Sequence, residues 1–119
     1  MVAGAPVSFT IPMPPSLNNL FKNVRRGRAA TKDYLNWQRE AGYHLNIQRI
    51  RSIKGPVRVA ISYPDEGQRD LDNICKVILD LCVKRKIIVN DSRKWVRAIN
   101  LEWADIPLTT VTLTEVVAA

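Results

Sequence analysis

Two aspartates and a lysine lie close together in the stretch Arg69-Asp70-Leu71-Asp72-Asn73-Ile74-Cys75-Lys76, and a third aspartate, Asp91, follows. Carboxylates held near one another repel unless a cation lies between them. A divalent ion such as Mg²⁺ or Mn²⁺ suits such a cluster because it prefers oxygen ligands. The sequence therefore predicts a metal site made by Asp70, Asp72 and Asp91, with Lys76 beside it.

This set of residues matches the needs of phosphodiester hydrolysis. A bound divalent metal polarises a phosphoryl oxygen, lowers the pKa of an attacking water and stabilises the leaving oxygen. A lysine can steady the water or the charge that develops in the transition state. We therefore expect a metal-dependent nuclease whose catalytic residues are Asp70, Asp72, Asp91 and Lys76.

The charge of the chain indicates a nucleic acid as the substrate. Its 119 residues include 18 Lys and Arg against 11 Asp and Glu, so the formal net charge is +7 and the pI is about 9.9. A surplus of this kind favours a polyanionic partner. A metal ion would also cancel the repulsion between the clustered acids and the phosphates of that partner.

Basic residues gather in two parts of the sequence. The segment 22–32 contains no acid and includes Gly27, which is typical of an exposed loop. The second group, Lys84-Arg85-Lys86, lies between the acidic motif and Asp91, and Arg93, Lys94 and Arg97 follow on the other side of Asp91. We expect contacts with DNA from both groups and from two residues of the motif, namely Lys22, Arg25, Arg26, Arg28, Lys32, Arg69, Asn73, Lys84, Arg85 and Lys86.

The acidic motif also has a purely structural interpretation. Asp70 could cap a helix, Asp72 would be favoured by the positive helix start, and Lys76 could pair with Asp72, each for about 0.3–1 kcal/mol. On that interpretation the protein is a non-catalytic basic DNA-binding module.

A nuclease for other branched DNA, such as flaps or forks, is a further alternative. A glycosyltransferase that uses Asp-x-Asp fits poorly with a chain of 119 residues and a pI near 9.9.

Hydrophobic periodicity predicts a short series of elements. Apolar residues alternate with polar ones in the expected strands and recur at helical spacing in the expected helices, the first of which has Thr31 as its N-cap. The strands are expected over 7–13, 57–63, 95–103 and 109–116, and the helices over 31–51 and 71–84. The short connection predicts that the last two strands form a hairpin, and 14–28 is expected to be irregular.

The expected fold is α/β, a single compact domain over residues 1–119 in which a mixed sheet of about four strands packs with two helices. The order of the strands is left open. The second helix carries the acidic motif at its start, and Asp91 comes from a loop.

Cys75 and Cys82 would lie about 10 Å apart along this helix, which is too far for a disulfide. Both cysteines are therefore expected to be buried thiols.

The sequence contains no feature that predicts a membrane partner. No apolar run approaches the roughly 20 residues needed to cross a bilayer. The first residues also lack the charged and apolar regions of a signal peptide. We therefore expect a cytoplasmic location.

With these motifs in place, the chain resembles the RusA-type Holliday junction resolvases, which are crossover-junction endodeoxyribonucleases of bacteria and their phages. The resemblance covers nearly the whole chain. It rests on the opening strand followed by Pro14-Pro15-Ser16-Leu17-Asn18-Asn19, on the motif from Arg69 to Lys76, and on the helix that ends before Val89-Asn90-Asp91.

The resemblance implies a role for individual residues. By position, the metal-binding carboxylates of the family resemble Asp70, Asp72 and Asp91, and its catalytically important lysine resembles Lys76. Members of the family often have an acid just before the last aspartate. This chain has Asn90 there, which offers a neutral oxygen and no charge.

The resemblance also implies an activity and an assembly. The family resolves four-way DNA junctions by paired symmetric nicks during DNA recombination and repair, with Mg²⁺ as cofactor and Mn²⁺ as a substitute. A homodimer is implied as well, because a four-way junction has approximate two-fold symmetry and must be cut on two opposed strands.

Overall fold

A computed structural model describes residues 5–16, 19–67 and 70–116 of the chain. The elements in chain order are β1 (Val7–Ile11), β2 (Phe21–Val24), β3 (Gly27–Ala30), α1 (Lys32–Gln48), β4 (Val57–Pro64), α2 (Asp72–Lys84), β5 (Val96–Ala104) and β6 (Thr109–Glu115). Within the described residues, two helices accompany a four-stranded mixed sheet and a separate small sheet of two strands. The predicted α/β class, with a four-stranded sheet and two helices, is confirmed.

The four-stranded sheet has the order β1-β6-β4-β5. Strand β6 is antiparallel to both β1 and β4, whereas β4 and β5 are parallel. The predicted hairpin between 95–103 and 109–116 is therefore wrong, because β4 lies between β5 and β6. The two strands differ in burial. Alternate residues of β6 are buried, which suits an interior position, whereas no residue of β5 is buried, which suits an edge.

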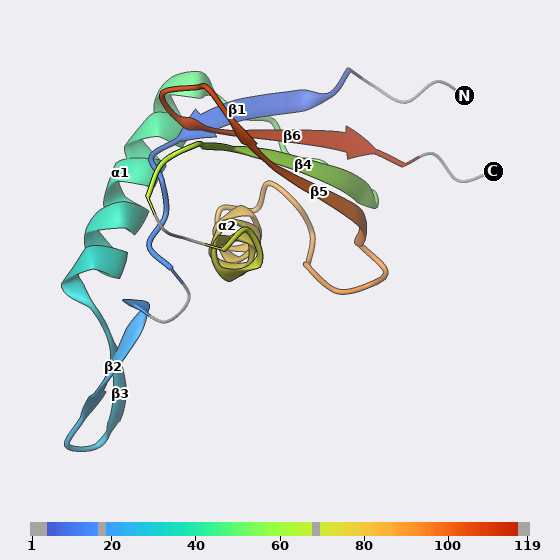
Figure 1. Ribbon diagram of the computed structural model, residues 1–119. Helices are drawn as coiled ribbons and strands as arrows, with labels where there is room; N and C mark the ends of the chain where they lie inside the picture. The colour runs from blue at the N-terminus through green and yellow to red at the C-terminus, as the bar shows by residue number, and fades with distance from the viewer. Residues whose placement is uncertain (1–4, 17–18, 68–69, 117–119) are drawn as a thin grey trace.

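The segment 14–28, which was expected to be irregular, contains most of a second and smaller sheet. Strands β2 and β3 pair as an antiparallel hairpin in which Val24 lies opposite Gly27. Figure 1 shows this hairpin projecting away from the rest of the molecule, below the start of α1. The apolar alternation that identifies a buried strand is missing, since no residue of the hairpin is buried. That is why periodicity did not reveal it.

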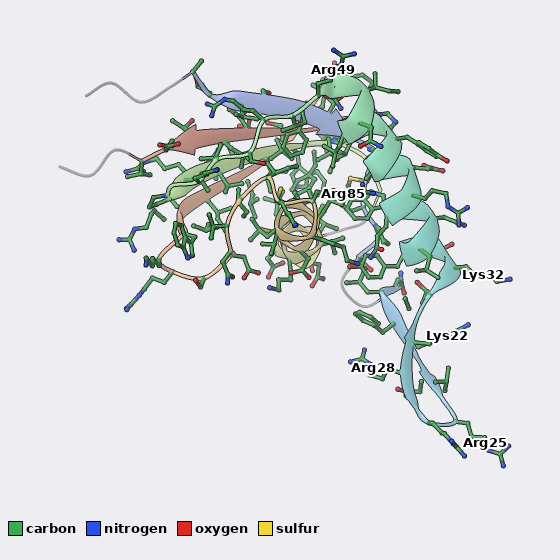
Figure 2. All side chains as sticks on the ribbon, turned by 180° about the vertical axis from the view of Figure 1, so that it is seen from behind. Lys22, Arg25, Arg28, Lys32, Arg49 and Arg85 are labelled. Atoms are coloured by element: carbon green, nitrogen blue, oxygen red, sulfur yellow. The ribbon has the colours of Figure 1, made fainter. Side chains whose placement is uncertain are left out.

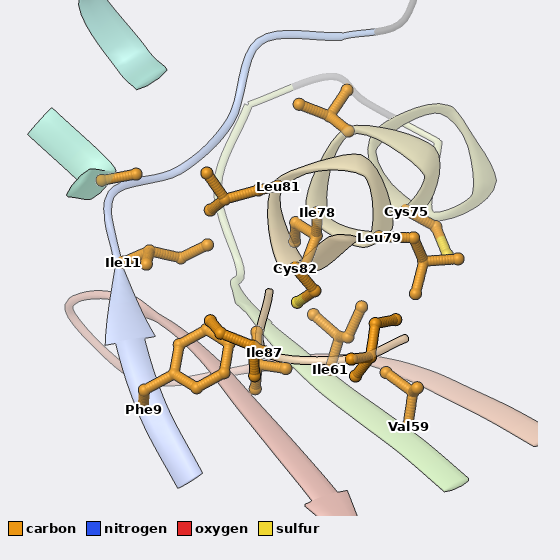
Figure 3. Close-up of a cluster of buried hydrophobic side chains, with 14 of the residues drawn as sticks. Phe9, Ile11, Val59, Ile61, Cys75, Ile78, Leu79, Leu81, Cys82 and Ile87 are labelled. Atoms are coloured by element: carbon orange, nitrogen blue, oxygen red, sulfur yellow. The ribbon is translucent and has the colours of Figure 1, made fainter. Parts of the chain in front are cut away.

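The core lies between α2 and one face of the four-stranded sheet (Figure 3). The apolar arc predicted for the second helix is confirmed, because its apolar residues from Ile74 to Cys82 are buried. They meet inward-facing side chains of the sheet such as Phe9, Ile11, Val59 and Ile61. Cys75 and Cys82 are free and buried, as predicted, and burial raises the pKa of the Cys82 thiol to about 12.

Helix α1 begins where the sequence predicts and ends earlier. The N–H of Tyr34 donates to Oγ1 of Thr31 at 3.2 Å, so Thr31 is the N-cap. The helix ends at Gln48 because Arg49 adopts a left-handed conformation with φ of 54°. No helix among the described residues is long and apolar enough to cross a membrane.

The outer edge of β1 is closed by a side chain of α1. The N–H of Thr10 donates to Oε1 of Gln48 at 2.8 Å, and Nε2 of Gln48 donates to the carbonyl of Thr10 at 2.8 Å. The amide of Gln48 thus pairs with this strand as a neighbouring strand would. Covering an edge in this way satisfies its backbone groups and removes a template for unwanted pairing.

We predict that Gln48→Ala lowers the free energy of unfolding by about 1–3 kcal/mol, because two part-buried backbone groups of Thr10 lose their partner. Gln48→Glu should also be destabilising, since a carboxylate accepts from the N–H but cannot donate to the carbonyl. Urea denaturation followed by circular dichroism measures both. Gln38→Ala is the matched control, because its side chain makes only an exposed contact at 3.4 Å with Lys84. Equal effects at the two positions would contradict the role of Gln48.

Candidate active site

The acidic motif lies at the start of α2. Asp70 precedes the helix, Leu71 is its N-cap residue, and Asp72 is its first residue. Leu71 makes no side-chain capping hydrogen bond, and the N–H of Asn73 donates to the backbone carbonyl of Asp70 at 3.1 Å. The side chains of Asp70 and Asp72 are exposed. The interpretation of Asp70 as a helix cap is therefore wrong, and its carboxylate faces solvent instead.

Lys76 lies one turn further along α2 and connects the helix to the loop that carries Asp91. Its ammonium donates a hydrogen bond to Oδ2 of Asp91, and Oδ1 of Asp80 lies 3.2 Å from it. The pair of Lys76 with Asp72 that the structural interpretation required is not formed. The side chain of Lys76 is 53% exposed, so its charge remains accessible to a ligand.

The surroundings of Lys76 favour its charged form. The hydrogen bond that Lys76 donates to Asp91 is the largest cause that raises the pKa of Lys76 above its ordinary value. Partial burial lowers this pKa, and Asp80 raises it further through a hydrogen bond and its charge. Since both acids favour the ammonium, Lys76 is a fixed positive charge near neutral pH.

The loop after α2 begins with a tight helix ending. Lys86 adopts a left-handed conformation with φ of 59°. Its N–H donates to the carbonyl of Val83 at 3.0 Å, and the N–H of Ile87 donates to the carbonyl of Cys82 at 2.8 Å. These two bonds form a Schellman motif, with buried Ile87 and Cys82 as its apolar pair. The direction in which the chain leaves α2 is thus fixed.

The far end of the same loop is also held. The N–H groups of Trp95 and Val96 each donate to the carbonyl of Ser92 at 2.9 Å, just before β5. Between the two ends, Oδ1 of Asn90 accepts from the N–H of Asp91 at 2.6 Å. The amide of Asn90 therefore acts on the backbone of Asp91, and the loop presents the Asp91 carboxylate to Lys76.

The structure brings part of the predicted site together. Lys76 and Asp91 are in contact, and Asp72 lies one turn before Lys76 on the same helix. No group of three or more His, Cys, Asp or Glu side chains within 5–16, 19–67 and 70–116 is close enough to hold a metal ion. Three carboxylates repel in the absence of a cation, and here an ammonium neutralises Asp91. The metal site stays a prediction.

The two predicted groups of basic residues lie in different places (Figure 2). Lys22, Arg25, Arg26 and Arg28 are exposed on the β2–β3 hairpin, and Lys32 begins α1. The second group, Lys84 to Lys86, lies at the end of α2, about 18 Å along the helix axis from Asp72 at 1.5 Å per residue.

Lys84 and Arg85 of the second basic group contact α1, which the sequence analysis did not predict. Nζ of Lys84 lies 3.4 Å from Oε1 of Gln38. The guanidinium of Arg85 rests against Gly42, where any Cβ would overlap it. Cations at this end of a helix are also favoured by its dipole. These contacts give Lys84 and Arg85 a structural role, and their predicted contacts with DNA remain untested, as do those of Lys86 and Asn73. Arg69 lies outside the described residues.

One residue of the site was missed by sequence reasoning. This residue is Asp80, whose carboxylate pairs with Lys76 from the following turn of α2. The signal was available, because Lys76 and Asp80 are four residues apart and such pairs are neighbours on a helix surface. Two acids flank Lys76 at this spacing, Asp72 and Asp80, and the spacing alone does not distinguish between them.

We predict that Asp91→Asn lowers the pKa of Lys76 more than Asp80→Asn does, because the hydrogen bond donated to Asp91 is the largest cause of the upward shift. Titration of the ¹³Cε signal of Lys76 by NMR measures both. An upward shift also means that the ion pairs stabilise the folded protein below the ordinary lysine pKa, and that this contribution is lost as pH rises through the shifted value. A larger change in Asp80→Asn would show that Asp80 is the main partner.

A known protein family matches most of this chain. The family model described as endodeoxyribonuclease RusA matches residues 12–114, a range that includes the acidic motif, Lys76 and Asp91. No curated protein matches the chain. The match covers most of the chain, both helices and all the described strands except β1, which ends at Ile11, and the last residue of β6, Glu115. The chain therefore belongs to the RusA family of endodeoxyribonucleases.

Proposed function

We propose that this protein is a Mg²⁺-dependent, structure-specific endodeoxyribonuclease that resolves Holliday junctions by paired symmetric nicks in DNA recombination and repair. The contact between Lys76 and Asp91 is the observation that supports it best. This contact joins the acidic motif of α2 to the one predicted site residue that is distant in sequence. Membership of an endodeoxyribonuclease family supports the reaction class.

The chemical type of the acidic side chains suits a magnesium ion. Asp70, Asp72 and Asp91 offer carboxylate oxygens, which are the ligands that Mg²⁺ and Mn²⁺ prefer. Asp70 and Asp72 form no ion pair within the described part of the chain, and Asp91 already accepts a cation, the ammonium of Lys76. These three residues would hold the metal, which when bound supplies Lewis-acid chemistry and an activated water.

Lys76 has two partners, and this suits a role in the reaction. If the Asp91 carboxylate turns to a metal, the ion pair with Asp80 still restrains the Lys76 side chain. The restrained ammonium would then meet the negative charge that develops on the phosphoryl oxygens during cleavage. Asp80 lies on the side of Lys76 away from Asp72, so it can position Lys76 without joining the metal ligands.

The choice of a junction as substrate rests on charge and symmetry. A net charge of +7 suits a large polyanion, and the basic hairpin lies apart from the acids. Two opposed strands must be cut to separate a four-way junction, and a two-fold homodimer would present one active site to each. We therefore propose a homodimer as the working form.

We predict that Asp72→Asn abolishes nicking of a synthetic immobile four-way junction in Mg²⁺ and leaves junction binding intact or slightly tighter. The amide is a poorer metal ligand, while the loss of a negative charge reduces repulsion from DNA. Denaturing gels measure nicking and gel shifts measure binding. Asp105→Asn is the matched control, since it removes the same charge from an exposed residue between β5 and β6.

The wild-type protein should nick the junction and not a linear duplex, and EDTA should stop the reaction. Flaps and forks belong in the same assay, because preferential cutting of those would assign a different branched substrate. Normal nicking by Asp72→Asn would remove Asp72 from the mechanism. Junction binding without nicking by the wild-type protein, in Mg²⁺ or Mn²⁺, would favour a non-catalytic DNA-binding module.

We also predict that a supercoiled plasmid with an extruded cruciform is converted mainly to the linear form. A dimer cuts both strands within the lifetime of one complex, whereas a single cut relaxes the plasmid and removes the cruciform. Agarose gels separate the linear and nicked products. A product that is almost all nicked circle would contradict paired cutting by a dimer.

A further inference from the structure

The β2–β3 hairpin projects from the molecule, and its base meets the rest of the protein through Phe21 and Ala30. It extends beyond the start of α1 in Figure 1, and no residue in its two strands is buried. The projection makes the molecule elongated. Its radius of gyration is 14.8 Å and its extents are 53 × 35 × 27 Å. A compact chain of this length would have a radius of gyration of about 13.5 Å.

A two-stranded hairpin is marginally stable when it stands alone in water. This hairpin is held at its base. The N–H of Thr31 donates to the carbonyl of Leu20 at 2.9 Å, and Leu20 is buried. The ring of Phe21 meets the buried ring of Tyr34 edge to face at 5.7 Å. The base is thus fixed to α1, and the rest of the ribbon lacks a core of its own.

The tip of the hairpin is made of cations on a tight turn. Arg25 and Arg26 form the two-residue turn, and Gly27 follows with φ of 109°. A positive φ at this place is typical of a turn that ends in a glycine bulge, and glycine adopts it without strain. Val24, before the turn, is 43% exposed.

The strands carry further cations and no acid. Lys22 lies on β2, and the guanidinium of Arg28 on β3 lies over the ring of Phe21 at 5.3 Å from its centroid. The ribbon therefore has four positive charges, at Lys22, Arg25, Arg26 and Arg28, within ten residues that contain no negative charge. A polyanion is the partner that such a surface fits.

We propose that the β2–β3 hairpin enters the major groove of one arm of the branched DNA. This inference rests on the proposed function. A two-stranded ribbon has the width to enter that groove, and phosphates line both of its sides. Lys22 and Arg28 on the strands would meet these phosphates, and the tip from Val24 to Arg26 would reach the base edges. A second copy of the chain is a poor occupant, because its net charge of +7 repels the ribbon.

The fold places the basic hairpin and the candidate active site on different elements. The hairpin joins α1, whereas the acidic motif and Lys76 belong to α2. A rigid base would hold the groove of one DNA arm at a fixed orientation relative to the rest of the protein. The hairpin is thus a positioning and binding element, so its loss should weaken capture of DNA and leave cleavage of saturated substrate possible.

A photocrosslinking experiment tests the location of the tip. The native thiols, Cys75 and Cys82, are buried, so a cysteine introduced by Val24→Cys can be labelled selectively with a benzophenone maleimide. Ile47→Cys is the matched control, because residue 47 is 81% exposed near the opposite end of α1. Figure 2 shows that end, marked by Arg49, far from Arg25. Both variants carry Asp72→Asn and are irradiated with the junction in EDTA.

We expect the Val24→Cys probe to crosslink a few adjacent nucleotides of one arm, and the Ile47→Cys probe to crosslink little DNA. Dimethyl sulfate should show protection of guanine N7, which lies in the major groove, at the same nucleotides. Equal crosslinking by the two probes, protection confined to adenine N3 in the minor groove, or crosslinks to another protein chain would each overturn the proposal. In those cases nicking by the wild-type protein would still support the proposed function, whereas failure to bind any junction would refute both.

Charge removal gives an independent test by binding. Lys22→Gln with Arg28→Gln should weaken junction binding and reduce the slope of log affinity against log salt by about 2, roughly 1 for each lost phosphate contact. Arg39→Gln with Arg49→Gln removes the same charge from exposed positions on or just after α1 and should leave the slope nearly unchanged. Equal losses in the two double variants would show that net charge, and not the hairpin, carries the effect.

Discussion

The packing of α2 against the sheet is the constraint that the candidate site depends on. The apolar face of this helix is buried from Ile74 to Cys82, so its orientation about its own axis is fixed. Asp72, Lys76 and Asp80 are spaced by four residues and therefore share one stripe on the polar face. The core thus determines which charged groups meet the loop that contains Asp91, although no charged residue takes part in that core.

The contact between Lys76 and Asp91 shows how a cationic protein can hold neighbouring acids. An acidic cluster repels phosphates, and a basic protein gains nothing from exposing one without a compensating charge. Lys76 supplies part of that charge from within the chain and lies between two carboxylates, Asp80 and Asp91. The loop holds Asp91 at a fixed distance because Ile87 and Ile88 are buried on one side of it.

Much of the fold follows from the sequence. Helical periodicity placed both helices, and Thr31 marked the start of α1 because its hydroxyl is a good capping group. Strand neighbours were harder to predict. The short link between β5 and β6 favoured a hairpin, but pairing depends on burial across the whole sheet, and β6 lies between β1 and β4. The hairpin of β2 and β3 has no buried face, so hydrophobic alternation could not reveal it.

The arrangement of the candidate site was predictable where local spacing determines it. The roles of Asp70, Asp72 and Asp91 as metal ligands stay a prediction. That Asp72 and Lys76 share one face of α2 could be predicted, because they are four residues apart. The partner of Lys76 could not, because Asp72 and Asp80 are equally spaced from it and only the loop geometry distinguishes them. The basic residues Lys84 and Arg85 are close to Asp91 in sequence. At the end of α2, however, they lie next to α1, where Lys84 contacts Gln38 and Arg85 contacts Gly42.

The strand order has a consequence for how the molecule is made. Strand β6 is the last of the sheet in sequence and lies between β1 and β4, where Val7 faces Leu113. Strand β1 therefore has no neighbouring strand in this sheet until β6 is in place. Contacts between residues that are so far apart in sequence slow folding. While the chain is being synthesised, the basic hairpin and the acidic helix leave the ribosome before the sheet can close. The surfaces that would meet DNA thus acquire their relative orientation only after β6 has emerged.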